Sequence, residues 1–318
     1  MDPATNIHPI SSAKGHDVFC GYFEDFRCER QFDIINAAHV FAHNRDCLAF
    51  LKGLKALMHD DSILFVQTSQ ADMVLNGEFD TIYHEHINFF NAASMLALSK
   101  RAGLPMIDIL KTQIHGTSYV FVFSKTRPVR SHLAEALEEE HAAGLQAEPV
   151  YDLWASRFVP ATFENIGARV AARPPHLPVH ATSRSTLPCE MPPFVALRFR
   201  CRATAEKLRT LLADTDAEVV GYGAAAKGNT LLNFAKVKPS VVVDDNPLKQ
   251  NKFTPGMSVR VVQIEYIRSL PADKPVWFVP LAWNFFAEIK AKILEARSKN
   301  ANEGDRFVTY FPDVSLAR

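Results

Sequence analysis

The sequence predicts an α/β fold in two domains. Two β-α-β patterns carry this prediction, one over residues 32–66 and one over 218–243, each with a helical pattern between two short apolar runs. Such units build sheets of parallel strands that helices cover. A length of 318 residues gives each of two domains enough chain to bury a core.

The first domain has five expected elements. In chain order they are strand 32–36, helix 47–58, strand 62–66, helix 92–102 and strand 119–123. The two earlier strands are short apolar runs and are expected to be buried, while leucines at helical spacing mark the helix between them. Gly103 ends the second helix as a natural C-cap. Aromatic and β-branched residues favour the last strand.

The middle of the chain departs from this rhythm. Residues 132–143 are expected to form an acidic helix, with the run Glu138-Glu139-Glu140 as a solvated face. Prolines then interrupt residues 159–199, where no periodicity survives. Two interpretations stay open for this stretch: a disordered insertion, or a translation artefact such as a retained intron.

Regular patterns resume in the last third of the chain. The expected elements are helix 203–212, strand 218–221, helix 227–234, strand 240–243, strand 276–279, helix 283–296 and strand 307–310. A glycine turn separates the first of these strands from its helix, and this β-α-β unit predicts a Rossmann-like domain. We therefore expect domains at 1–130 and 203–318, joined by a segment at 131–202 that holds the acidic helix and the prolines.

Composition disfavours several classes of protein. Lys and Arg number 35, as do Asp and Glu, so the net charge of zero favours neither nucleic acid nor a membrane surface as a partner. No apolar run reaches bilayer length, and the first residues do not resemble a signal peptide. The five cysteines form no C-x-x-C pair, which argues against a zinc site and fits a reducing compartment. We expect a soluble, cytoplasmic enzyme that holds no metal.

The most informative motif is Tyr83-His84-Glu85-His86. In an extended segment the two histidines face one side, and the tyrosine and glutamate face the other. A carboxylate beside an imidazole fixes its tautomer and raises its basicity, which suits a general base. A metal site is less favoured, because the helical zinc signature needs histidines four residues apart. A loop cluster that only forms hydrogen bonds stays an alternative.

A first turn, His115-Gly116-Thr117-Ser118, leads into a strand. Its small residues let backbone N–H groups and a hydroxyl approach a ligand closely. A turn with a hydrogen-bonded histidine and no ligand fits the same residues equally well.

A second turn, residues 221–230, lies between a strand and a helix, where phosphate-binding loops occur. It contains Gly223, Lys227 and Asn229, yet it is neither a Walker A motif nor a complete dinucleotide fingerprint. The context favours an anion or nucleotide over a generic glycine turn. Residues 244–250 follow the next strand at the same edge of the sheet, although Asp245-Asn246-Pro247 also suits a simple turn.

Together these motifs resemble the C-methyltransferases that act on nucleotide-linked deoxy-keto-sugars, including the TDP-sugar C-3-methyltransferases. The matching stretches are 40–43, 79–86 (FDTIYHEH), 115–118, 221–232 and 243–256. The resemblance implies a partial Rossmann-like SAM-methyltransferase domain followed by a Rossmann-like C-terminal domain. It also implies S-adenosyl-L-methionine as cofactor and a nucleotide-sugar as substrate.

The resemblance assigns roles to individual residues. In this family a base removes the proton next to the sugar carbonyl, the enolate attacks the sulfonium methyl, and His86 matches that base. Glu85 and Tyr83 would orient it or contact the sugar, and His43 would assist near the keto oxygen, where charge develops. The implied cofactor contacts are Asp2 and Asn36. The implied substrate contacts are His115, Ser118, Gly223, Lys227, Asn229 and Lys249.

Departures from the family pattern bear on activity. The family's N-terminal zinc-binding subdomain and glycine-rich cofactor loop have no counterpart in this chain, so we expect a truncated enzyme with an incomplete cofactor site. The second glycine of the family's H-G-G-S motif is Thr117 here, and a family arginine aligns with Val120. The alternative is a non-catalytic nucleotide-sugar-binding module derived from such an enzyme. A nucleotide-sugar dehydrogenase is less favoured.

Overall fold

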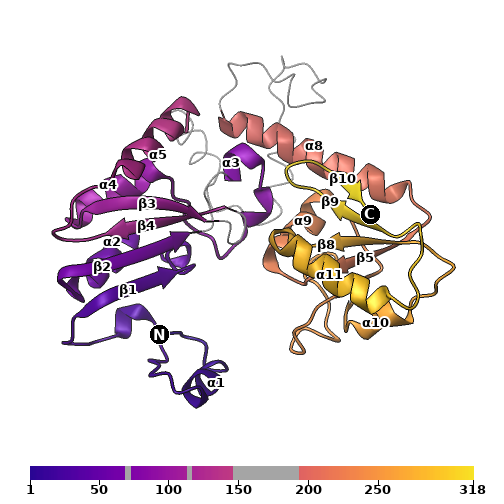
Figure 1. Ribbon diagram of the computed structural model, residues 1–318, viewed down its shortest axis with the longest axis horizontal. Helices are drawn as coiled ribbons and strands as arrows, with labels where there is room; N and C mark the ends of the chain where they lie inside the picture. The colour runs from indigo at the N-terminus through magenta and orange to yellow at the C-terminus, as the bar shows by residue number, and fades with distance from the viewer. Residues whose placement is uncertain (69–72, 113–116, 146–192) are drawn as a thin grey trace. The chain divides into compact units, whose positions relative to one another are not determined.

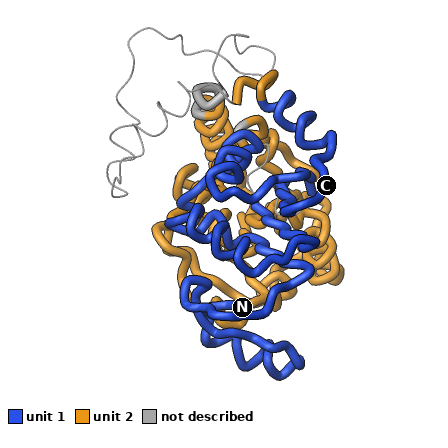
Figure 2. The backbone as a smooth tube through the Cα atoms, turned by 90° about the vertical axis from the view of Figure 1, so that its left-hand side faces the viewer, with its two compact units in different colours: residues 1–71, 85–140 blue, residues 72–84, 141–318 orange. Residues whose placement is uncertain are grey.

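The computed structural model describes residues 1–68, 73–112, 117–145 and 193–318. The chain divides into two compact units, the first made of residues 1–71 and 85–140 and the second of 72–84 and 141–318 (Figure 2). The division therefore falls inside the motif at 83–86, between His84 and Glu85. The domain boundaries expected from the sequence stay a prediction.

A four-stranded sheet of order β1-β2-β4-β3 forms the centre of the first unit (Figure 1). Its strands are β1 (Phe32–Ala38), β2 (Met58–Thr68), β3 (Met106–Thr112) and β4 (Ser118–Phe123). Strands β1 and β2 are parallel, whereas β4 runs antiparallel to both of its neighbours. The helices are α1 (His8–Ala13), η1 (Phe23–Asp25), η2 (Phe41–His43), α2 (Cys47–Ala56), α4 (Ala92–Ala102) and α5 (Ser131–Ala142). The α/β fold class is confirmed.

Local signals set the ends of these helices. Asp46 caps α2 by accepting a hydrogen bond from the backbone N–H of Ala49 at 2.9 Å. At the start of α4, Asn91 and Ser94 form a reciprocal capping box. Gly103 ends α4 in the left-handed conformation at φ 62°, as its sequence position predicts.

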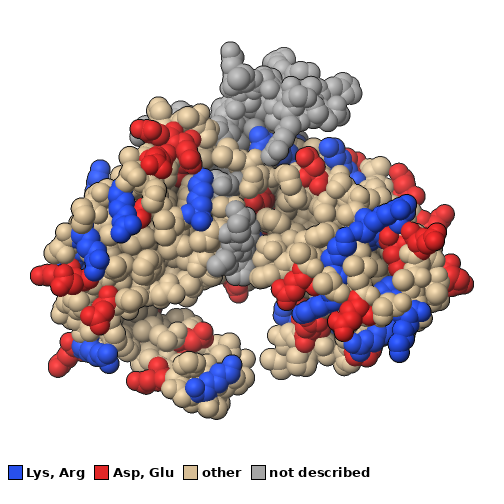
Figure 3. All heavy atoms as spheres, viewed as in Figure 1, with Lys and Arg blue, Asp and Glu red and all other residues tan. Residues whose placement is uncertain are grey.

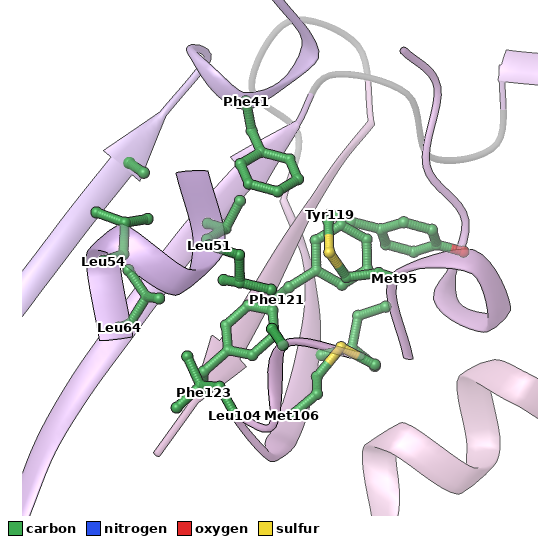
Figure 4. Close-up of a cluster of buried hydrophobic side chains, with 14 of the residues drawn as sticks. Phe41, Leu51, Leu54, Leu64, Met95, Leu104, Met106, Tyr119, Phe121 and Phe123 are labelled. Carbon is green, nitrogen blue, oxygen red and sulfur yellow. The ribbon is translucent and has the colours of Figure 1, made fainter. Parts of the chain in front are cut away.

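The core of the first unit lies between the helices and the sheet (Figure 4). Apolar side chains from α2, α4, the strands of the sheet and the loop before β3 meet there with almost no exposure, and they include Leu51, Leu64, Met95, Leu104, Phe121 and Phe123. Burial of such side chains contributes about 1.5–3 kcal/mol each, so this cluster holds α2 and α4 on the sheet.

Two expectations about burial in this unit are wrong. Strand β1 is the edge of the described sheet, and Ile34 is 69% exposed because no described element covers its face of the strand. Glu140 was expected on a solvated face, yet it is only 2% exposed. It is buried because its carboxylate accepts hydrogen bonds from the backbone N–H groups of Ala92 and Ala93, at the N-terminus of α4.

The second unit contains a six-stranded sheet of order β10-β9-β8-β5-β6-β7, parallel except for β10 (Figure 1). The strands are β5 (Glu218–Tyr222), β6 (Val241–Val243), β7 (Val261–Val262), β8 (Val276–Pro280), β9 (Arg306–Thr309) and β10 (Ser315–Ala317). The helices are α3 (Met73–Asn76), η3 (Phe79–Thr81), α8 (Pro193–Ala213), α9 (Ala226–Ala235), α10 (Glu265–Ser269), η5 (Trp283–Phe285) and α11 (Phe286–Arg297).

Strand β5 pairs with β6 on one side and with β8 on the other, so the strand order reverses between β5 and β8. Open parallel sheets bind ligands outside the carboxyl ends of the strands at such a switch point. The Rossmann-like prediction for this part of the chain is therefore confirmed, and its geometry singles out the loops after β5 and β8.

Several element boundaries differ from the prediction. Helix α8 begins at Pro193, ten residues before the expected start, because proline is compatible with the first turn of a helix. Strands β3, β7 and β10 were not expected. None of the helices within the described ranges is both long and apolar enough to cross a membrane. On the face that Figure 3 shows, basic and acidic side chains are interspersed and neither forms a continuous patch.

Candidate functional site

In the first unit, the segment after Glu85 lies along the turn that follows β1. The backbone N–H groups of Ile87 and Asn88 both donate to the carbonyl oxygen of Ala42, each at 3.1 Å. His43 belongs to η2, which starts three residues beyond the end of β1. These hydrogen bonds place Glu85 and His86 beside His43 at the carboxyl end of β1.

The side chain of His43 is fixed by this neighbourhood. Its Nδ1 atom lies 2.8 Å from the carbonyl oxygen of Glu85. A carbonyl oxygen only accepts hydrogen bonds, so Nδ1 carries the proton and the neutral ring offers Nε2 as an acceptor. When the ring is protonated, Nε2 becomes a donor as well. The same contact orients His43 through the backbone of Glu85.

The imidazoles of His43 and His86 are in contact. Their ring centroids are 5.0 Å apart, with an angle of 54° between the planes. His86 is buried, at 9% exposure, whereas His43 is exposed. The ring of Phe89 lies 6.4 Å from that of His86 and contributes an apolar wall. A pair of imidazoles, one buried and the other exposed, is suited to proton transfer near the surface of the protein.

Ser118 lies at the same edge of this sheet. It begins β4, which runs antiparallel to β2, and the next residue, Tyr119, is opposite Thr68 near the carboxyl end of β2. The side chain of Ser118 is fully buried opposite Thr112 of β3, so a substrate role for its hydroxyl stays a prediction. His115 lies outside the described residues.

The two predicted cofactor contacts are both exposed. Asp2 accepts a hydrogen bond from the backbone N–H of Ala4 through Oδ1 at 2.8 Å, and its backbone is bridged to Cys20. Asn36 lies on β1, two residues before the strand ends. No hydrogen bond within the described part of the chain joins Asp2 to Asn36.

The other two residues of the motif, Tyr83 and His84, belong to the second unit. Their rings are 6.5 Å apart in an edge-on arrangement. They follow η3, whose three residues Phe79, Asp80 and Thr81 are all buried.

At the switch point of the second unit, the glycine turn after β5 is tied to the end of β6. Gly223 has φ +93°, a conformation that favours glycine, and its N–H donates to the carbonyl oxygen of Val243 at 2.7 Å. The backbone N–H of Ala224 donates to Asp244 Oδ2 at 2.7 Å. Lys249 Nζ donates to the carbonyl oxygen of Ala224 at 2.9 Å and lies 3.4 Å from Asp244 Oδ2. These contacts fix the turn.

A second glycine brings α9 against the end of β8. A Cβ atom at Gly228 would lie 2.5 Å from Leu281 Cβ, so a larger residue would push the helix away. The close approach sets the N-terminus of α9 beside the loops after β5 and β8.

A cavity of about 250 Å³ lies beside this turn. Its lining residues are Ala224, Ala225, Asn229, Leu232, Lys249, Lys252, Phe253, Thr254, Pro255, Val261 and Leu281. Of the predicted substrate contacts, Asn229 and Lys249 line it, whereas Gly223 and Lys227 do not. Phe253 is 64% exposed, so the cavity combines two lysines with an aromatic face open to solvent.

Asp245, for which the sequence left both a ligand site and a simple turn open, forms a small polar network at this edge. Tyr222 donates to Oδ1 at 2.7 Å, and Lys292 pairs with Oδ2 at 2.8 Å. Burial raises the pKa of Asp245, but the hydrogen bonds from Lys292 and Tyr222 outweigh that effect and hold the pKa below its usual range. The sequence signal for a polar network at this edge of the sheet is a pair of consecutive acids directly after a strand.

Lys227 lies at the start of α9 and faces an aromatic ring. Its Nζ atom is 5.5 Å from the centroid of the Trp283 ring, in the loop after β8. The Trp283 indole N–H in turn donates to Asp80 Oδ2 at 2.8 Å. Asp80 lies in the matching stretch 79–86 but had no role assigned to it, and Trp283 lies outside the motifs. The two residues are functional candidates that no local pattern could link, since 203 residues separate them.

Comparisons with known proteins match two stretches of the chain to family models. Residues 4–109 match a methyltransferase domain model, and residues 189–312 match the model of a C-methyltransferase C-terminal domain. The chain is 25% identical over 326 residues to C-methyltransferase NovU of Streptomyces niveus, with 98% of this chain aligned. The alignment spans 66% of that relative's length, just under two thirds. The predicted resemblance to the C-methyltransferase family is thus confirmed, since an early stretch of this chain matches a methyltransferase domain and a later stretch matches a C-methyltransferase C-terminal domain.

Proposed function

We propose that the chain is a SAM-dependent C-methyltransferase that acts on a nucleotide-linked keto-deoxysugar, with His86 as the base. The observation that carries the proposal is the contact between His86 and His43 at the carboxyl end of β1, within the stretch that matches a methyltransferase domain. A buried imidazole beside an exposed one supports removal of a proton from carbon next to a carbonyl group.

The roles follow from the hydrogen bonds of the two rings. His86 takes the proton from the carbon next to the keto group, which leaves an enolate. His43 keeps Nδ1–H on the carbonyl oxygen of Glu85, so only its protonated form donates from Nε2 to the enolate oxygen. A cationic donor stabilises the charge that develops on that oxygen. Tyr83 and Glu85 orient the base or contact the sugar.

The cofactor S-adenosyl-L-methionine supplies the methyl group on a sulfonium. Asp2 and Asn36 fit the hydroxyl groups of its ribose, because both side chains are exposed and polar, and only one Asp2 oxygen is engaged by Ala4. A carboxylate and an amide are common acceptors for ribose hydroxyls.

The cavity of the second unit supports the nucleotide part of the substrate. Asn229 and Lys249 line it, and two of the three donors on Lys249 Nζ are directed to Ala224 and Asp244, which leaves one for a phosphate oxygen. Lys227, at the start of α9, adds a second cation near the helix N-terminus, where anions are stabilised. Gly223 shapes the turn, and Ser118 and His115 complete the proposed substrate contacts.

The alternative is a nucleotide-sugar-binding module without catalysis. The cavity and its glycine turn lie wholly within the second unit, so they support binding whether or not methyl transfer occurs. Neither the base nor the cofactor contacts would then matter for binding.

Proton abstraction can be measured without the methyl donor. The chain is incubated in heavy water with a TDP-linked 4-keto-deoxysugar, and deuterium at the carbon next to the carbonyl is followed by NMR. His86→Asn is expected to lower the enzymatic exchange rate at least about 100-fold. His16→Asn, at an exposed histidine far along the chain from the motif, is the matched control.

Three outcomes separate the readings. Exchange in the native protein that is lost in His86→Asn supports the base assignment, and transfer of a labelled methyl group then tests the complete reaction. Unchanged exchange in His86→Asn would show that another group is the base. Tight substrate binding with no exchange would favour the non-catalytic module.

A further inference from the structure

The switch point of the second unit contains a buried acid from outside the six-stranded sheet. Asp80 lies on η3, in the stretch 72–84 that belongs to this unit although the sheet begins at residue 218. Its side chain is fully buried. Apolar contacts hold η3 in place: the Phe79 ring lies 4.7 Å from that of Phe234 on α9 and 5.5 Å from that of Phe311.

The carboxylate of Asp80 accepts a side-chain hydrogen bond from Trp283. Trp283 Nε1 donates to Oδ2 at 2.8 Å, whereas Oδ1 is buried with no hydrogen-bond partner among the described residues. A buried carboxylate costs several kcal/mol of desolvation, and burial outweighs the effects of Lys227, the Trp283 indole and the nearby backbone N–H groups on the pKa of Asp80. An acid in such a position destabilises the fold, so a structural role explains it poorly.

The hydrogen bond from Trp283 to Asp80 is the first of two contacts that link Asp80 to the cation of Lys227. Asp80 fixes the Trp283 ring through its indole N–H. Lys227 Nζ lies over the face of this ring, 5.5 Å from the ring centroid. A cation over an indole face is held by about 0.5–2 kcal/mol, and only while the ring keeps its orientation. The ring of Phe311, 5.4 Å from that of Trp283, packs against it from another side.

We propose that Asp80 is a positioning residue: through the indole N–H of Trp283 it orients the ring that holds Lys227 at the start of α9, ready for the phosphate groups of a nucleotide. The inference rests on the proposed function of the nucleotide site. It explains what holds Lys227 in position, although Lys227 is not one of the residues that line the cavity.

The charges around Asp80 are consistent with this role. Burial raises the pKa of Asp80, and the positive charge of Lys227 is the largest effect that lowers it. Two other titratable groups interact with Asp80, the hydroxyl of Tyr310 and the thiol of Cys201. Burial keeps both of them neutral, because it raises the pKa of Tyr310 well above its usual value and that of Cys201 to about 12. Lys227 is therefore the cation whose charge favours the ionised form of Asp80.

The test measures binding of inorganic pyrophosphate and of TDP by calorimetry. Asp80→Asn keeps an oxygen that accepts from the indole and is expected to bind within about twofold of the native protein. Asp80→Leu replaces the carboxylate with a larger apolar side chain that has no acceptor, and it should bind at least about 10-fold more weakly. Trp283→Phe keeps a ring but loses the N–H, and should weaken binding to the same extent. Asp273→Asn and Trp277→Phe are the matched controls.

The double variant Asp80→Leu/Trp283→Phe decides whether the two residues act together. Because they act through one hydrogen bond, the double variant should bind no more weakly than either single variant. Additive losses would overturn the proposal, and so would an Asp80→Asn protein that binds as weakly as Asp80→Leu. Melting curves confirm that each variant is folded, and Trp283→Phe keeps the test informative if Asp80→Leu is not.

A second readout does not depend on nucleotide binding. Hydrogen–deuterium exchange of the peptide that contains residues 79–84 should increase in Trp283→Phe and Asp80→Leu, but not in Asp80→Asn. If the native protein binds neither pyrophosphate nor TDP, the proposed nucleotide site is wrong while this measurement still tests the link. Unchanged exchange in Trp283→Phe and Asp80→Leu would contradict the positioning role of Asp80 itself.

Discussion

Glu140 caps the N-terminus of α4 by accepting a hydrogen bond from the backbone N–H of Ala92, 48 residues earlier in the chain. Its other oxygen accepts from the N–H of Ala93 at 3.1 Å, and the hydroxyl of Tyr119 approaches at 3.3 Å. The first N–H groups of a helix have no partner within the helix, so a carboxylate there also favours the helix dipole. Helix α5 thereby supplies acceptors for the first backbone N–H groups of α4.

Removing this cap should destabilise the first unit. Glu140→Ala leaves two N–H groups and a hydroxyl without their acceptor, at an expected loss of about 1–3 kcal/mol in free energy of unfolding. Denaturation in urea, followed by circular dichroism, measures the change. Glu139→Ala is the matched control, because its exposed pairing with Lys111 is worth under about 1 kcal/mol. Equal losses in the two variants would refute the capping role.

The same carboxyl should make stability depend on pH. Burial raises the pKa of Glu140 above its usual 4.5, by more than its hydrogen-bond donors lower it. The folded state therefore binds the proton more tightly than the unfolded state, and this contribution to stability falls as the pH rises from 4.5 through the folded-state pKa. Glu140→Gln removes this contribution. A native and a Glu140→Gln protein with the same pH dependence in that window would contradict the prediction.

Arg297 is the most buried cation of the second unit's described residues. It pairs with Asp305 at 3.0 Å and donates to the carbonyl oxygens of Leu270, Pro271 and Lys274. Lysine lacks the planar fork that reaches all of these acceptors. Arg297→Lys should therefore cost about 3–5 kcal/mol of unfolding free energy. Arg268→Lys, in an exposed pair with Glu265, should cost under about 1 kcal/mol in the same urea titration.

His43 offers a test of the proposed oxyanion donor. His43→Asn removes the imidazolium that is expected to stabilise the enolate, so deuterium exchange into the keto-sugar should slow about 100-fold. Substrate affinity should stay within about twofold of the native value. A proportional loss of affinity with no change in the exchange rate at saturation would assign His43 to binding instead.

Local sequence patterns were enough for the β-α-β units. Helix α2 and strand β2 follow from spacing and apolar runs, since neighbouring residues determine both. Strand β3 was missed because Asp108 interrupts its apolar pattern. That acid is buried at 5% exposure and pairs with His132, a partner that is distant in sequence. Strand β10 has only three residues and depends on its pairing with β9.

In the candidate sites, too, only the features formed by neighbouring residues could be predicted from the sequence. The turn after β5 could be identified because its glycines and polar residues are consecutive. The pairing of His43 with His86 was suggested only by the family resemblance, and the link from Asp80 to Trp283 crosses 203 residues. Contacts of this kind depend on how helices and strands pack, which residue spacing does not encode.

Gly256 provides a test of how the cavity is shaped. It has φ +78°, and a Cβ atom there would lie 2.0 Å from Asn233 Oδ1. Asn233 donates to the carbonyl oxygens of Asn229 and Pro255, two residues that line the cavity. Gly256→Ala should therefore combine backbone strain of about 1–3 kcal/mol with a displaced Asn233, and it should weaken TDP binding.

Gly15→Ala separates the two effects. Gly15 has nearly the same backbone conformation, φ +82°, but a Cβ atom there meets nothing within 4 Å. It should show the strain alone, as a loss of about 1–2 kcal/mol in unfolding free energy with TDP affinity unchanged. If Gly256→Ala loses no more stability than Gly15→Ala and binds TDP normally, then Asn233 moves without cost and does not shape the cavity.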